Sequence, residues 1–130
     1  MVHETLVKEW FRYAEMDLAS AKVLMETMYP PPLEIICYHC QQAAEKCLKG
    51  LHLAVNDDIE KTHDLVRLLN KLECYKPVPD EIYDIAENLT QFSTRTRYPQ
   101  ESCVDAHQTT LAIAQAERLM PWAINQVDCD

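Results

Sequence analysis

A locally basic stretch in the last third of the chain carries residue types suited to binding an anion. Arg95 and Arg97 stand two apart, and no acidic residue occurs from Asn88 to Gln100. A helix start is expected directly after this stretch, and two guanidinium groups near a helix N-terminus favour a phosphate or a carboxylate. Tyr98 adds an aromatic face and a hydroxyl. We therefore expect Arg95, Arg97 and Tyr98 to bind an anion; alternatively, the two arginines pair with carboxylates of this acidic chain.

Asp17 and His63 are two further polar residues that lie at distinctive positions in the predicted helices. Asp17 is the one charged residue on the apolar stripe of the first predicted helix. Burying an unpaired carboxylate is costly, so we expect an ion pair or a hydrogen bond from Asp17 to the second helix. His63 follows Thr62, which is a plausible N-cap of the third helix. We expect His63 to have a packing or capping role there.

Cysteine and histidine residues are also possible metal ligands. Cys37, His39 and Cys40 lie close together, and Cys103 and His107 are four apart. A second Cys-x-x-Cys pair is missing and nothing has zinc-finger spacing. Three of the six cysteines fall at helical spacing in an apolar pattern, which is typical of small buried side chains in a reducing cytoplasm. We expect a cytoplasmic protein without a metal or another cofactor.

Five helices would have to position these residues. Apolar residues recur three and four apart in five segments, and polar or proline-containing links separate the segments. Short links favour antiparallel neighbours. We therefore predict an all-α fold, a five-helix antiparallel up-and-down bundle without a sheet, in which residues 1–130 form a single domain. The predicted helices run from about Thr5 to Met28, from about Leu33 to Val55, from an N-cap at Thr62, from Pro79 to Gln91 or Phe92, and from a capping box of Ser102 and Asp105 to about Ala123.

Composition excludes several classes of protein. Gly50 is the only glycine, so the sequence cannot contain the glycine-rich phosphate loop of a P-loop protein or of a Rossmann-type fold. The net charge of -9 argues against an extended surface that binds nucleic acid independently of its sequence, so any anion site must be local. No run of 18 apolar residues is present, and we expect neither a membrane span nor a signal peptide.

The segment from His39 to Leu51 lies within the second predicted helix and has two distinct sides. Small residues on its apolar side, Ala43 and Cys47 among them, would let another helix approach closely. Glu45 and Lys49 are four apart in the favourable order for an ion pair. We expect the polar side to consist of Gln41, Gln42, Glu45, Lys46 and Lys49.

Three blocks of sequence together resemble the HEPN domain family of small all-helical proteins. The first is Gln-Gln-Ala-Ala-Glu-Lys-Cys-Leu-Lys-Gly-Leu at residues 41–51, the second is Thr62-His63-Asp64-Leu65, and the third is Arg97-Tyr98-Pro99. The resemblance extends from Trp10 to about Trp122. It implies a HEPN-like bundle, a homodimer, and a cleft near the two-fold axis that Arg97 and Tyr98 face.

The resemblance also implies two functions. Many HEPN proteins are metal-independent ribonucleases with an arginine, four to six residues and then a histidine. The windows after Arg95 and Arg97 contain no histidine, and nine residues separate Arg97 from His107. We therefore expect a nucleotide- or RNA-binding component of a toxin–antitoxin-type module whose partner is a minimal nucleotidyltransferase. The alternatives are a ribonuclease in which His107 acts as a displaced catalytic partner of Arg97, and a structural helical dimer without catalysis.

Overall fold

The computed structural model describes residues 3–56, 58–93 and 104–128, and these residues contain five helices and no strand. The expected all-α, five-helix fold is confirmed. No helix of the described residues is long and apolar enough to cross a membrane. The helices are α1 (Glu4–Thr27), α2 (Leu33–Asn56), α3 (Leu65–Leu72), α4 (Asp80–Thr90) and α5 (Ala106–Asp128).

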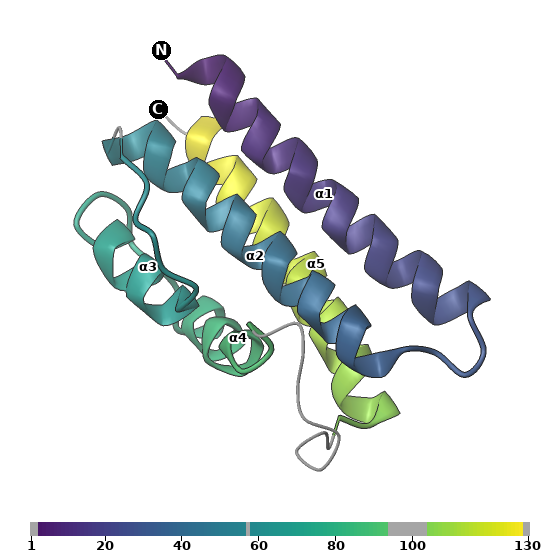
Figure 1. Cartoon of the computed structure of the whole chain (residues 1–130). Helices are drawn as coiled ribbons and strands as arrows, with labels where there is room; N and C mark the ends of the chain where they lie inside the picture. Colours follow the sequence, from purple (N-terminus) through teal and green to yellow (C-terminus); the bar gives the residue numbers. More distant parts are fainter. Residues whose placement is uncertain (1–2, 57, 94–103, 129–130) are drawn as a thin grey trace.

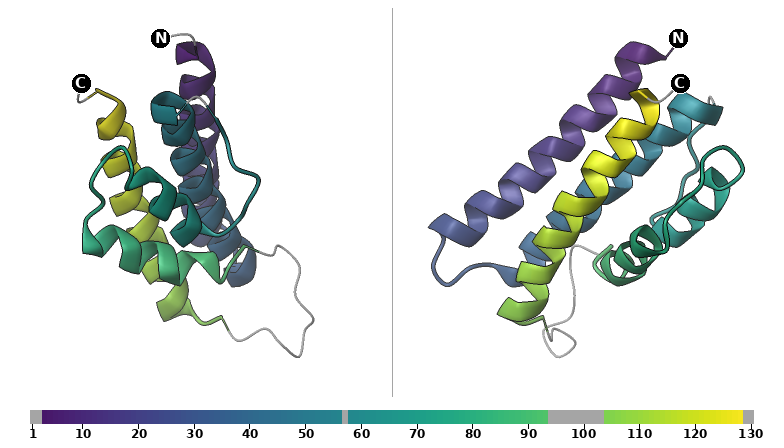
Figure 2. Two further views of the ribbon diagram at one scale, coloured as in Figure 1. Left: turned by 90° about the vertical axis from the view of Figure 1, so that its left-hand side faces the viewer. Right: turned by 180° about the vertical axis from the view of Figure 1, so that it is seen from behind.

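The three long helices lie side by side, and the two short helices cover α2 on the side away from α1 (Figures 1 and 2). The link after α1 contains three consecutive prolines, which cannot continue a helix, so α2 returns antiparallel to α1. Both chain ends lie at the same end of the molecule (Figure 1), so α5 runs in the direction of α2. Helix α2 contacts each of the other four helices and forms the centre of the fold.

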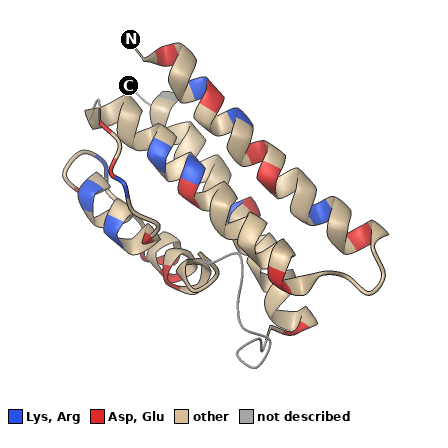
Figure 3. Ribbon diagram, viewed as in Figure 1, with Lys and Arg blue, Asp and Glu red and all other residues tan. Residues whose placement is uncertain are grey.

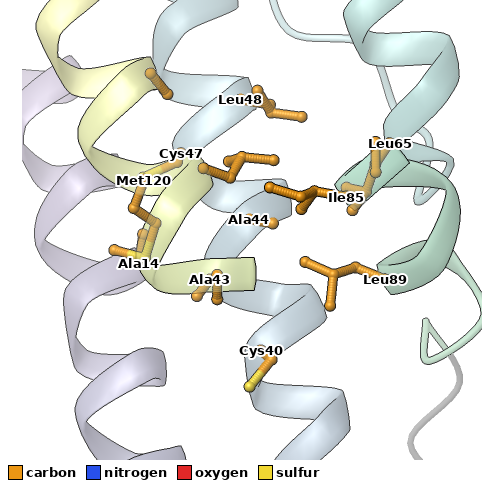
Figure 4. Close-up of a cluster of buried hydrophobic side chains, with 14 of the residues drawn as sticks. Ala14, Cys40, Ala43, Ala44, Cys47, Leu48, Leu65, Ile85, Leu89 and Met120 are labelled. Carbon is orange, nitrogen blue, oxygen red and sulfur yellow. The ribbon is translucent and has the colours of Figure 1, made fainter. Parts of the chain in front are cut away.

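Small side chains on α2 allow this dense packing. Ala43, Ala44 and Cys47 are fully buried, and they lie among larger side chains from α4 and α5 (Figure 4). At Gly50 the approach is closest: a Cβ atom there would lie 2.8 Å from Cε1 of Phe11 and 3.0 Å from Cβ of Trp10. The single glycine of the chain therefore lets α1 and α2 approach each other.

Two helix starts differ from the expected ones. The N-cap of α3 is Asp64 rather than Thr62, because the Asp64 carboxylate accepts hydrogen bonds from the backbone N–H groups of Val66 and Arg67. Thr62 instead accepts a hydrogen bond from the Asp64 backbone N–H. The α3 segment therefore begins two residues later than a Thr62 cap would require.

Helix α5 begins at Ala106 with a reciprocal capping box. The Gln108 N–H donates to Oδ1 of Asp105 at 2.7 Å, and the Asp105 N–H donates to Oε1 of Gln108 at 3.0 Å. Ser102, the other half of the expected capping box, lies outside the described residues. Ala106, the first residue of the helix, is exposed. At its other end α5 continues to Asp128, beyond the expected end near Ala123.

Candidate functional site

The expected anion-binding residues Arg95, Arg97 and Tyr98 lie outside the described residues. The chain on either side is described as far as Ser93, which follows α4, and from Val104, which precedes α5.

His107, the expected catalytic partner of Arg97, is the second residue of α5 and is exposed. No hydrogen bond or ion pair joins it to another described residue. A general base works when its ring is held in place against the proton that it takes. Among the described residues, nothing holds the His107 ring in this way.

Helix α2 carries a buried carboxylate with three hydrogen-bond donors. Glu45 is 4% exposed. Its Oε1 accepts hydrogen bonds from Nε2 of Gln41 and from Nδ1 of His63, each at 2.9 Å, and its Oε2 accepts one from Nζ of Lys49 at 3.0 Å. Gln41 and Lys49 are themselves buried. The cluster therefore satisfies a carboxylate that would be costly to bury alone.

The cluster also keeps Glu45 ionised. Burial alone would raise the pKa of the Glu45 carboxyl, but hydrogen bonds from Gln41, His63 and Lys49, with the Lys49 charge, hold that pKa below its usual value. A carboxylate accepts hydrogen bonds, so Nδ1 of His63 carries a proton. In the neutral ring the other nitrogen, Nε2, then has a free lone pair.

His63 presents this second nitrogen on the surface, since its side chain is 69% exposed. It lies just before α3, beside the C-terminal end of α4, because the Leu65 N–H donates to Oγ1 of Thr90 at 3.1 Å. The N–H groups that open α3 are already bonded to Asp64 and Thr90. The start of α3 therefore offers an oriented imidazole rather than free backbone donors.

A second polar cluster joins α1 to α2. The carboxylate of Asp17 accepts a hydrogen bond from Nδ1 of His39 at 2.9 Å and one from Nζ of Lys46 at 2.5 Å. The side chain of Asp17 is 12% exposed. Asp17 is thus held by two residues of α2, and it lies between the two helices rather than in an open cleft.

The cysteines of α2 are buried in the core. Burial raises the pKa of the Cys40 and Cys47 thiols to about 12, and the Cys37 thiol contacts the Thr109 hydroxyl at 3.5 Å. Thiols with such a high pKa are poor ligands and nucleophiles, because the thiolate is the reactive form. In the described part of the chain, no group of three or more histidine, cysteine or acidic residues could hold a metal ion.

Basic side chains in the described part of the chain are mostly neutralised by its own carboxylates. Lysines and arginines are interspersed with acidic residues along the helices (Figure 3). At least eight of the ten described lysines and arginines form ion pairs with acidic side chains of the chain. The described surface therefore leaves few cations for a bound anion.

The cluster around Glu45 differs from what its sequence pattern suggests. Gln41, Glu45 and Lys49 were expected on the polar side of the second helix, and all three are buried. The helices α3 and α4 cover that side of α2. Two features of the sequence point to this cluster. Gln41, Glu45 and Lys49 follow one another at intervals of four residues, and the block Thr62-His63-Asp64-Leu65 comes after them.

Comparisons with known proteins agree with this fold. The family model of the HEPN domain matches residues 7–127. The crystal structure of TT1696 from Thermus thermophilus is 26% identical, with a TM-score of 0.77 over 92% of this chain and 96% of that one. The structure of ST0689, an archaeal HEPN homologue, is also 26% identical, with a TM-score of 0.72 over 93% of this chain and 97% of that one. No curated protein matches the chain significantly.

Proposed function

The chain belongs to the HEPN domain family, and from this premise we propose that it is the binding component of a two-protein module of the toxin–antitoxin type. Its protein partner is a minimal nucleotidyltransferase, as the family resemblance implies, and its ligand is a nucleotide or RNA. The ligand phosphate binds to Arg97 and Arg95, with Tyr98 stacking on a base.

The charge distribution carries the proposal for the ligand site. Because at least eight of the ten described cations are already paired within the chain, the arginines at 95 and 97 are the best remaining source of positive charge for a phosphate. Arginine binds phosphate through two parallel N–H bonds, which suits a local site on an acidic protein.

A binding assay tests this part of the proposal. Fluorescence polarisation with a labelled short RNA and with a labelled nucleotide would compare the wild type with Arg97→Ala. Arg118→Ala is the matched control, because Arg118 is an exposed arginine held by Glu81 at 2.9 Å. We expect Arg97→Ala to abolish binding and Arg118→Ala to preserve it. Equal losses in the two variants, or no binding by the wild type, would refute the site.

The proposed partner has its own test. Co-expression with a small nucleotidyltransferase encoded in the adjacent reading frame should give a complex that survives size-exclusion chromatography. Absence of such a neighbouring frame, or of the complex, contradicts the module while leaving the RNA-binding result intact.

A second candidate function is metal-independent RNA cleavage, and the Glu45–His63 pair favours it. A histidine held by a carboxylate through one nitrogen, with the other in solvent, is arranged to accept a proton from a ribose hydroxyl. Arginine cannot do this at neutral pH. His63, rather than His107, is therefore the better candidate for a general base.

Cleavage assays in the presence of a chelator separate the candidates. We expect the purified protein to leave RNA intact, in line with a binding function. If it cleaves RNA, His63→Ala should lower the cleavage rate on the order of 100- to 10,000-fold, and His107→Ala should leave the rate unchanged. Cleavage that depends on His107 and not on His63 would favour the displaced histidine instead.

A further inference from the structure

An open groove lies between α1 and α5, which run side by side (Figure 2). Both helices pack mainly on α2 and contact each other less extensively. The groove consists of two adjoining hollows, because Glu15, Leu18 and Met120 line both of them. From Glu15 to Glu26 its α1 side spans about three helical turns, or about 16 Å. The groove is therefore long enough to hold a segment of another helix.

The floor of the groove is apolar. Leu18 of α1 and Ile124 of α5 are partly buried, and Met120 of α5 is buried between the two helices. Methionine is unbranched and flexible, so its side chain adapts to the shape of an apolar partner. A partner that removes these side chains from water would gain free energy from their burial.

The sides of the groove are acidic. Glu15, Glu26 and Glu117 line it together with one cation, Lys22. The Lys22 ammonium donates a hydrogen bond to Oε2 of Glu117 at 2.8 Å, and Glu117 and Glu26 both raise its pKa. Glu15 is exposed and forms no hydrogen bond or ion pair with another described residue. Three carboxylates against one ammonium leave the groove with an excess of negative charge.

A proline in α5 adds a backbone acceptor. Pro121 has no N–H group, so the carbonyl of Glu117 lacks the helical hydrogen bond that it would accept from position 121. Both residues line the groove. Carboxylates and carbonyls only accept hydrogen bonds, and the one donor, Lys22, is already held by Glu117. The groove therefore suits a partner that brings positively charged donors.

We propose that this groove binds an amphipathic helix of another protein, with lysines or arginines bordering its apolar side. Apolar side chains at steps of three and four contact Leu18, Met120 and Ile124, and the cations beside them reach Glu15 and Glu26. A helix fits better than an extended segment, because the described residues offer no strand edge for backbone pairing. The inference goes beyond the proposed function, since a groove of negative charge repels a nucleotide or RNA.

Fluorescence polarisation with a labelled synthetic peptide tests the chemistry of the partner. The probe has about 15 residues, about one turn more than the groove, with leucines at steps of three and four and lysines beside them. We expect it to bind the full chain. A scrambled peptide, and a peptide with glutamates in place of the lysines, should each bind at least about tenfold more weakly. No binding of the probe, or equal binding of either control peptide, overturns the proposal.

Charge reversal in the protein locates the site. Glu15→Lys should weaken binding of the lysine peptide at least about fivefold and should strengthen binding of the glutamate peptide, a gain that misfolding cannot produce. Glu87→Lys is the matched control, because Glu87 is an exposed glutamate of α4 that also lacks a hydrogen bond or ion pair among the described residues. If the two variants change the affinities equally, net charge alone attracts the peptide and the groove is not its site.

A second pair of variants tests the apolar floor. Ile124→Ser should weaken binding of the lysine peptide, because it removes an apolar side chain that the peptide contacts. Leu111→Ser should leave the affinity unchanged, since Leu111 is a 43% exposed residue of α5 outside the groove. Circular dichroism verifies that each variant is folded. An unchanged affinity in a folded Ile124→Ser variant would contradict docking in the groove.

Discussion

Replacing Lys49 by methionine tests whether the buried cluster on α2 depends on its one cation. Lys49 is 8% exposed, and its ammonium lies 3.0 Å from Oε2 of Glu45. Methionine keeps the apolar stem of the side chain and removes the charge. The carboxylate then retains only the hydrogen-bond donors Gln41 and His63. Removing one partner of a buried ion pair costs about 3–5 kcal/mol; because two donors remain, we expect about 3 kcal/mol and a Tm lower by roughly 10 °C.

Urea unfolding followed by circular dichroism at pH 7 measures this loss. The double variant Glu45→Gln with Lys49→Met should recover part of the stability, because no unpaired charge is then buried. Lys8→Met is the surface control, since Lys8 pairs with Glu4 in solvent and such pairs contribute little. If the double variant is as unstable as Lys49→Met, lost packing rather than an unpaired carboxylate is the cause, and the reasoning fails.

Three further predictions concern α2. Gly50→Ala should destabilise the fold by about 1–2 kcal/mol despite a better helix propensity, because the new Cβ meets Phe11 at 2.8 Å, and Phe11→Leu in the same chain should relieve part of this in urea unfolding. Burial lowers the pKa of His52, so the stability that the neutral ring contributes is present above about pH 6.5 and is lost as the pH falls. In His52→Gln, the free energy of unfolding should therefore change less between pH 7 and pH 5 than it does in the wild type. Cys40 and Cys47, with thiol pKa values of about 12, should stay unmodified by iodoacetamide at pH 7 until urea is added, as judged by peptide mass spectrometry.

Periodicity and proline links were sufficient to predict the helices. The second helix begins at Leu33, as expected, because the three prolines before it leave no earlier start. The cap at Asp64 could not be chosen over Thr62 from sequence, because both residue types cap helices well. The choice depends on the hydrogen bond from the Leu65 N–H to Oγ1 of Thr90 in α4. This contact joins residues that are distant in the sequence.

The buried cluster could not be predicted in the same way. Gln41, Glu45 and Lys49 have the spacing of an ordinary solvated helix face. Their burial follows from the position of α3 and α4, and the Glu45–His63 contact joins residues 18 apart. For Asp17 the sequence was more informative, since a lone carboxylate on an apolar stripe requires a partner wherever the neighbouring helix lies.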